Sequence, residues 1–219
     1  ISYAYEGSRY MRRFDWAMKR IKVPLAKMPM LAQEGELWVA SLLAEVRLEF
    51  SNLIVMMPYI GKKNIWKRKL ILATVCLSFY NVLKDRGWST GKIGGLIHTI
   101  AELFCKSLPA WLRKTAGRMR FSSARLRKLL EGAVYSQLRR YDEDWVFKVV
   151  PGNSRFDFGV DIYRCAIHTF YRSQGAEDLV PYICRLDHLL GNSFGYKIKR
   201  KNEIHQGAHY CDCRFTSIG

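Results

Sequence analysis

Apolar residues recur at helical spacing through the first two thirds of the chain. Residues 9–27 carry them three and four positions apart, which predicts an amphipathic helix that Pro24 and Pro29 interrupt. A second apolar stripe extends over residues 34–57, where Gly35 is the single helix-breaking residue. The beginning of the chain is therefore expected to be helical.

Three further helices are predicted downstream, over residues 66–86, about 89–105 and about 122–140. Small hydroxyl residues stand where an N-cap is needed, namely Ser89 or Thr90 and Ser122 or Ser123. The most apolar run, residues 70–80, is far shorter than the roughly 20 residues of a membrane-spanning helix. We therefore expect a buried helix there and no membrane segment.

The composition changes at about residue 144, where β-branched and aromatic residues take over. Residues 145–150 and 156–163 predict two strands around a turn at 151–153. Two helices and two more strands follow, at residues 165–174, 177–190 (closed by Gly191), 195–201 and 208–216. The expected fold is α+β, with a helical N-terminal region, residues 1–143, packed on an α+β region, residues 144–219, that has a small antiparallel sheet. One compact unit is the favoured organisation.

Positive charge is concentrated in the middle of the chain. The 36 Lys and Arg residues exceed the 19 Asp and Glu residues, for a net charge of +17. Residues 62–128 hold sixteen of the basic residues and two acidic ones, Asp85 and Glu102. This stretch could face nucleic acid or an anionic surface, but no groove-reading motif accompanies it, so a solvated helix face is favoured.

The six cysteines are expected to be reduced thiols. A chain of 219 residues can build a core without disulfides, and the N-terminal residues lack the apolar stretch of a secretory signal. These features favour a cytoplasmic protein. They leave the oligomeric state open, a homo-oligomer included.

One predicted helix carries a candidate thiol site. Cys184, Asp187 and His188 occupy positions i, i+3 and i+4, so their side chains share a helix face. A carboxylate and an imidazole can lower a thiol pKa and transfer protons. The alternative interpretation is a small buried cysteine beside two surface residues, and spacing alone favours it.

The last predicted strand carries a row of possible metal ligands. Its two-residue period places His209, Cys211 and Cys213 on one face, with Asp212 on the other. Cys-x-Cys along an extended strand spaces its sulfurs poorly for a tetrahedral zinc ion, so zinc is a weak alternative and no cofactor is expected. Cys165 begins a helix, where the dipole favours a thiolate, or it is a buried packing residue.

These segments resemble the L-2-amino-thiazoline-4-carboxylic acid hydrolase family. The resemblance rests on Cys165, Pro181-x-x-Cys184-x-x-Asp187, Arg200 and Gly207-x-x-x-Cys211-Asp212-x-x-Phe215, and more loosely on Pro58-x-Ile60-Gly61-x-x-Asn64 and Leu-Lys-x-x-Gly-Trp-Ser at 83–89. It covers about residues 36–216. Cys213 departs from the pattern, since the family is expected to have Phe there.

The resemblance implies cofactor-free hydrolysis of a small cyclic amidine or thiazoline substrate at a C–N bond. Such a reaction needs a nucleophile, a proton donor and a cation for the substrate carboxylate. Cys184 or Cys211 would be the nucleophile, Asp187 or Asp212 the acid/base group, and Arg200 the carboxylate anchor. His188, Cys165 and Asn64 complete the predicted substrate-binding set.

A second resemblance suggests a function without catalysis. The order of a helix with a cysteine, a strand and Gly207-x-x-x-Cys211 is also similar to the 4-vinyl reductase domain, a small-ligand-binding module. Together with the basic stretch, it implies a ligand sensor that could associate with nucleic acid. DNA affinity that falls steeply with added salt would support this alternative.

Overall fold

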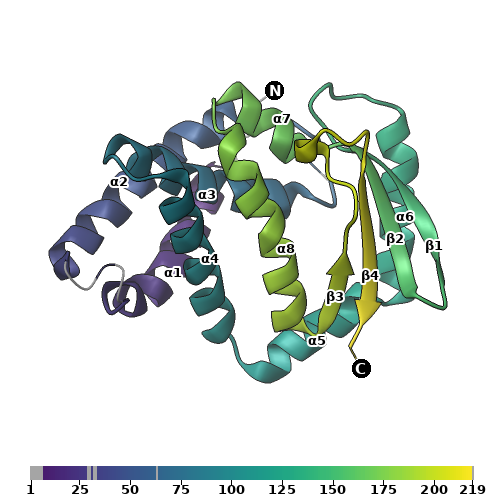
Figure 1. Cartoon of the computed structure of the whole chain (residues 1–219), viewed down its shortest axis with the longest axis horizontal. Helices are drawn as coiled ribbons and strands as arrows, with labels where there is room; N and C mark the ends of the chain where they lie inside the picture. The colour runs from purple at the N-terminus through teal and green to yellow at the C-terminus, as the bar shows by residue number, and fades with distance from the viewer. Residues whose placement is uncertain (1–6, 29–30, 32–33, 63, 219) are drawn as a thin grey trace. The chain divides into compact units, whose positions relative to one another are not determined.

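The computed structural model describes residues 7–28, 31, 34–62 and 64–218 of the chain. Helices and a small antiparallel sheet make up the structure, so the predicted α+β class is confirmed (Figure 1). Contacts divide the chain into two compact units, residues 1–57 with 69–107 and residues 58–68 with 108–219. The boundary predicted at residue 144 follows composition instead, and it stays a prediction.

The first unit is built mainly from four helices, as the apolar periodicity predicted: α1 (Gly7–Ala26), α2 (Gly35–Met56), α3 (Lys67–Asp85) and α4 (Thr90–Lys106). The helix α1 continues through Pro24 and ends two residues later, so the predicted interruption at Pro24 is wrong. Pro24 lies in the last turn, so the helix loses the one hydrogen bond of the missing N–H and ends soon afterwards. Pro29 lies outside the described residues.

The apolar stripes of these helices form the core of the first unit. Helix α1 packs against α2 and α4, and the rings of Phe14 and Phe50 stack with their centroids 5.1 Å apart. Ser89 caps α4 by accepting a hydrogen bond from the Lys92 N–H, as predicted. No helix within the described residues is long and apolar enough to cross a membrane.

The second unit combines a sheet with helices: α5 (Ala110–Arg120), α6 (Ser123–Gln137), β1 (Val146–Asn153), β2 (Phe156–Arg164), α7 (Ala166–Ser173), the short 3-10 helix η2 (Glu177–Leu179), α8 (Val180–Phe194), β3 (Tyr196–Lys199), the short 3-10 helix η3 (Ile204–Gln206) and β4 (Cys211–Ser217). Both predicted strand pairs are present. Helix α5 was not predicted, and α6 is capped by Ser122 as expected.

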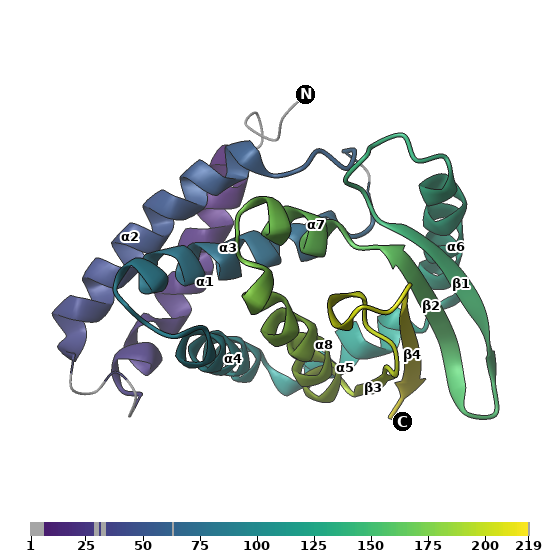
Figure 2. The same cartoon turned by 45° about the horizontal axis from the view of Figure 1, so that its top comes forward.

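The four strands form an antiparallel sheet in the order β1-β2-β4-β3. One face is apolar, and on it Phe158 of β2 stacks on Phe215 of β4 with the ring centroids 4.7 Å apart. Phe121, between α5 and α6, contacts Phe158, and α6 packs on β1. Figures 1 and 2 show α6 on one side of the sheet and α8 running beside β3.

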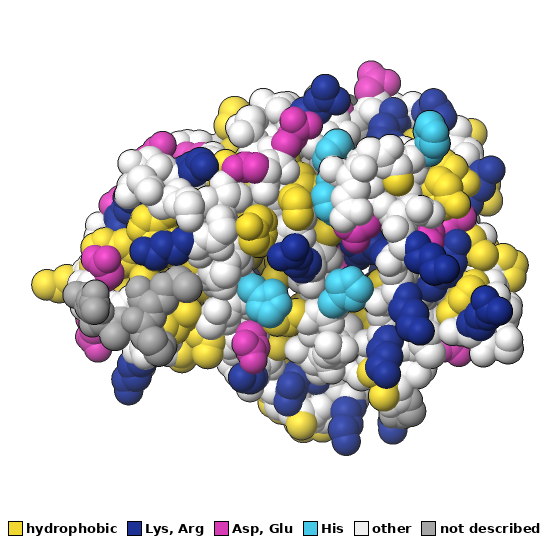
Figure 3. All heavy atoms as spheres, in the orientation of Figure 1, with side chains coloured by type: hydrophobic (Ala, Val, Ile, Leu, Met, Phe, Trp, Pro, Cys, Tyr) yellow, Lys and Arg dark blue, Asp and Glu magenta, His cyan; other side chains and the backbone are white. Residues whose placement is uncertain are grey.

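The opposite face of the sheet is polar because alternate residues of the strands point there. Asp161 of β2 forms an ion pair with Arg214 of β4 at 2.6 Å. Lys197 and Lys199 of β3 are exposed. Figure 3 shows Lys and Arg side chains gathered over the region that the strands occupy in Figure 1. The alternation therefore places the buried cysteines of β4 on the apolar face of the sheet and the charged side chains on the other.

Helix α8 is longer than predicted. It passes through Gly191 and ends at Gly195, whose φ of 79° is the left-handed conformation that favours glycine. Gly191 instead permits close packing, since a Cβ there would lie 2.7 Å from the carbonyl oxygen of Tyr196. The prediction that Gly191 closes this helix is therefore wrong, and the extra turn brings α8 against β3.

Candidate functional site

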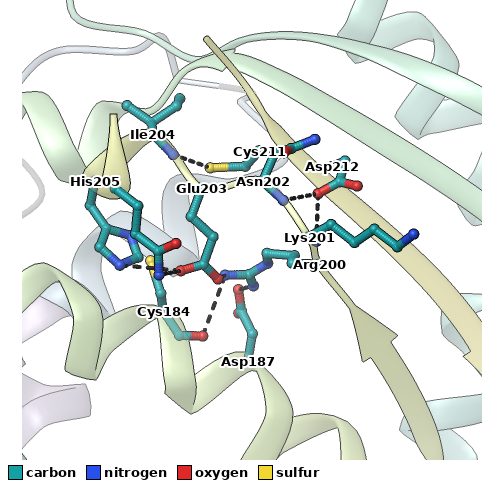
Figure 4. A network of polar contacts seen from close by, with 11 residues as sticks. Cys184, Asp187, Arg200, Lys201, Asn202, Glu203, Ile204, His205, Cys211 and Asp212 are labelled. Atoms are coloured by element: carbon teal, nitrogen blue, oxygen red, sulfur yellow. Dashed lines mark hydrogen bonds and ion pairs between the residues drawn. The ribbon is translucent and has the colours of Figure 1, made fainter. Parts of the chain in front are cut away.

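The candidate site is centred on Arg200, which directly follows β3. Its side chain is only 4% exposed, and its guanidinium group forms an ion pair with Asp187 of α8. The same group donates to a carboxylate oxygen of Glu203 at 3.5 Å and to the carbonyl oxygen of Cys184 at 3.5 Å (Figure 4). One buried cation thus joins α8 to the segment between β3 and β4.

The electrostatics of Arg200 follow from these contacts. Burial is the largest single influence and would lower its pKa, but the charges of Asp187 and the neighbouring thiols and Glu203 together outweigh it. The pKa is therefore raised and the guanidinium stays charged. Cys213 and Cys184 also interact electrostatically with Arg200. Asp187 and Cys184 lie on one face of α8, as their spacing predicted, and the structure adds the cation that meets them.

An imidazole–carboxylate pair lies beside this cation. The Nε2 atom of His205, in η3, is 3.2 Å from a carboxylate oxygen of Glu203, and the two side chains are 9% and 18% exposed. Burial lowers the pKa of His205 below its ordinary value, although the Glu203 carboxylate opposes this shift. Glu203 therefore contacts both the permanent cation Arg200 and an imidazole that is neutral near pH 7.

Cysteines on the covered face of the sheet complete the cluster. Cys211 and Cys213 are buried on β4, and the Cys211 sulfur accepts a hydrogen bond from the Ile204 N–H at 3.2 Å. Burial raises the pKa of the Cys211 thiol to about 11, and Cys165, at the start of α7, interacts with it. No disulfide joins the six cysteines, all of which lie within the described residues.

Two buried polar atoms of the cluster have no hydrogen-bond partner in the described structure: Nε of Arg200 and Nδ1 of His205. An unpaired buried polar atom is costly, so each such atom in a folded protein asks for an explanation. Both atoms belong to the same network in Figure 4. They mark it as a place where a ligand or water could complete the hydrogen bonding.

Two other predicted site residues, Asp212 and His188, do not face the Arg200 guanidinium. Asp212 points to the opposite face of β4, and its carboxylate accepts hydrogen bonds from the N–H groups of Lys201 and Asn202 at 2.8 and 2.6 Å. It fixes the start of the β3–β4 connection. His188 is exposed on α8, although its neighbour Asp187 faces Arg200. Their predicted roles, acid/base and substrate-binding, stay predictions.

Asn64 occupies a separate polar cluster at the start of β1. Its amide donates to both carboxylate oxygens of Asp144 at 2.9 Å and to the carbonyl of Ile60 at 3.0 Å, and its Oδ1 accepts from the Trp66 N–H at 2.9 Å. Burial raises the pKa of Asp144 to about 6. These hydrogen bonds give Asn64 a role in holding the loop that contains Ile60 and Trp66.

The row of possible metal ligands on the last strand, the weak alternative raised by the sequence, is not formed by the described residues. The strand β4 begins at Cys211, so His209 precedes it. The described part of the chain contains no group of three or more His, Cys, Asp or Glu side chains that could hold a metal ion, and this includes His209, Cys211 and Cys213.

Glu203 and His205 were missed by the sequence analysis. They lie inside the segment that carries Arg200, two residues apart, in a stretch with no periodic pattern. A short 3-10 helix turns His205 back toward Glu203, and Gly207, with φ of 88°, ends that helix. The signal available in the sequence was the Glu-x-His spacing, which alone is weak.

Together, fold and site define an α+β protein with buried thiols, an imidazole and carboxylates gathered around one arginine, which is a set of groups suited to nucleophilic and acid–base chemistry. The sequence profile described as L-2-amino-thiazoline-4-carboxylic acid hydrolase matches residues 69–215. The chain belongs to this family, which is named for a hydrolase. The resemblance to the 4-vinyl reductase domain stays a prediction.

No curated protein and no solved structure matches the chain. Family membership therefore gives the class hydrolase by name and assigns no residue to the reaction.

Proposed function

We propose that this protein hydrolyses a small cyclic amidine of the thiazoline type, opening the ring at a C–N bond, in the Arg200 cluster. The observation that carries the proposal is the ion pair of Asp187 with Arg200, whose guanidinium also interacts electrostatically with the Cys184 thiol, within a chain of this family. The thiol supplies a nucleophile and the carboxylate can transfer protons, which are two of the groups that the reaction needs.

Cys184 is the better candidate for the nucleophile. Its side chain is partly accessible, and it interacts electrostatically with the Arg200 guanidinium. Cys211 is buried, and its pKa of about 11 keeps it protonated at neutral pH. A thiol in that state is a poor nucleophile, so Cys211 is assigned a packing role.

Arg200 is better suited to organising the site than to capturing a substrate carboxylate. Its guanidinium already contacts Asp187, Glu203 and the Cys184 carbonyl. A substrate carboxylate would have to compete with Asp187 for the same donors. We assign Arg200 as the group that holds α8 and the β3–β4 connection in place around the substrate.

The test is turnover of L-2-amino-thiazoline-4-carboxylate, followed by NMR detection of the ring-opened carbamoyl product. The Cys184→Ala variant is expected to lose at least about 100-fold in kcat/KM, because the covalent route disappears. Cys105→Ala, a buried cysteine of the first unit, is the matched control and should keep its activity within about threefold.

The outcomes separate the alternatives. Absence of turnover by the wild-type protein contradicts the proposed substrate class. Turnover that survives in Cys184→Ala but disappears in Cys211→Ala moves the nucleophile to β4. Turnover unchanged in both variants excludes a thiol nucleophile.

A further inference from the structure

The pair formed by Glu203 and His205 is not among the groups assigned to the thiol chemistry above. His205 is held through Nε2 by Glu203, while its Nδ1 is buried and has no partner in the described structure. With an ionised carboxylate at Nε2, the neutral imidazole carries its proton there, and Nδ1 presents a lone pair. A buried imidazole with one nitrogen fixed and the other unpaired has the arrangement of a general base.

The direction of the side chains supports this assignment. Figure 4 shows the Cys184 side chain and the His205 imidazole on the same side of Glu203, with Arg200 and Asp187 completing the network. Glu203 accepts a contact from Arg200 through one oxygen and holds His205 through the other. The carboxylate is thereby fixed between the cation and the imidazole, which is how an orienting group acts in nucleophile–base–acid sets.

We infer that His205 is the proton-transfer residue of the site, that Glu203 is its positioning residue, and that Nδ1 faces the reacting atoms of a cyclic amidine. The inference rests on the proposed function and deepens it. It assigns a catalytic role to a residue outside the predicted set of Cys184, Asp187, Cys211 and Asp212.

The proton inventory of the reaction shows where such a residue is needed. The Cys184 thiol adds across the C=N bond: the S–C bond forms and the substrate nitrogen gains the thiol proton. The ring C–N bond then breaks as its nitrogen takes a proton from the exocyclic amino group. Water adds to the same carbon, and the thiol leaves with a proton, so the product gains one water and the enzyme is unchanged. His205 Nδ1 carries the proton at each transfer.

The charges around His205 predict the pH behaviour. Burial lowers the pKa of His205, and the Glu203 carboxylate raises it. Three other groups lower it: His168 of α7, Arg185 of α8, and Arg200. The active form is the neutral imidazole, so kcat/KM should rise with pH through an inflection below the ordinary histidine value of about 6.5. Removing the Glu203 carboxylate should move that inflection to lower pH.

The experiment compares His205→Gln and Glu203→Gln with wild-type protein. In His205→Gln, kcat should fall about 100-fold or more with KM within about threefold, and the acidic inflection should disappear. In Glu203→Gln, kcat should fall less and the inflection should shift downward. His98→Gln, an exposed histidine of α4 in the first unit, is the control and should match wild type.

A second measurement needs no turnover. Side-chain NMR of histidine-labelled protein should show His205 as the Nε2–H tautomer, with a pKa that falls in Glu203→Gln. A His205 pKa that does not respond to Glu203→Gln overturns the pairing. Wild-type turnover that persists in His205→Gln overturns the catalytic role alone, whereas absence of wild-type turnover overturns the proposed function together with it.

Discussion

Two carboxylates of the second unit, the half-buried Asp187 and the buried Asp144, differ in the partners that surround them. Asp187 faces the guanidinium of Arg200, which also contacts Glu203. Asp144 receives neutral donors, the Asn64 amide and the Trp145 N–H, and its interaction with Arg164 is the weakest of the named contributions to its pKa. Burial raises the pKa of Asp144 to about 6, although all three partners lower it.

This difference separates the charged Arg200 cluster from the Asp144 cluster, whose role is structural. Neutral hydrogen bonds satisfy a carboxylate without offsetting the cost of removing its charge from water, whereas a buried cation offsets it directly. The buried guanidinium of Arg200 therefore stays charged across neutral pH. The Asp144 cluster titrates near pH 6 and ties the 60–66 loop to the start of β1.

The largest effect is expected from removing the cation. Arg200→Met leaves Asp187 and Glu203 part-buried without their shared counter-charge, so unfolding free energy should fall by about 3–5 kcal/mol. Urea unfolding monitored by circular dichroism measures it. Arg172→Met is the matched control, because Arg172 is 73% exposed in its ion pair with Glu177, and such surface pairs contribute less than about 1 kcal/mol.

A loss below about 1 kcal/mol in Arg200→Met would show that the two carboxylates are solvated well enough to remain charged without the arginine. The contrast with Asp144 would then disappear, and the site would be more open than its burial indicates.

The second prediction concerns the pH dependence of stability. The folded pKa of Asp144, about 6, lies above the ordinary value of 3.8, so the folded state binds this proton more tightly than the unfolded state does. The contribution of Asp144 to stability is therefore fully present below about pH 4 and is lost as pH rises to about 6, by at most about 3 kcal/mol.

Asp144→Asn removes this titration. Its unfolding free energy, measured in urea at several pH values, should fall less between pH 4 and pH 6 than that of wild type, with the two curves parallel above pH 7. Equal slopes for the two proteins between pH 4 and pH 6 would mean that Asp144 titrates normally in the fold.

The surroundings of Asp187 also show which features of the site could be predicted from the sequence. Cys184 and Asp187 were placed together because i, i+3 spacing is a local property of a helix. Their meeting with Arg200 depends on how α8 packs against β3, which no local pattern encodes. Helix α5 was missed because its large apolar residues form no buried stripe, and Trp111 is 68% exposed.

Glycines show a similar limit. Gly191 and Gly195 are equally plausible helix ends in the sequence, but one is a packing contact with Tyr196 and the other holds the left-handed conformation. Glu203 and His205 meet through a short 3-10 helix, whose turn depends on the strands at both of its ends. Tertiary packing decides each of these cases.

The smallest effect is expected at Asp212, a carboxylate that is neither buried like Asp144 nor held by an arginine like Asp187 among its described contacts. Its Oδ1 accepts two N–H groups at the beginning of the β3–β4 connection, where water can replace it. Asp212→Ala should therefore lower the unfolding free energy by about 1 kcal/mol. Asp212→Asn keeps an acceptor oxygen and should recover most of that loss in the same urea titration.

Because the β3–β4 connection carries Arg200 and His205, Asp212→Ala should also raise KM modestly. A loss of kcat as large as that expected for Cys184→Ala would return Asp212 to the catalytic set.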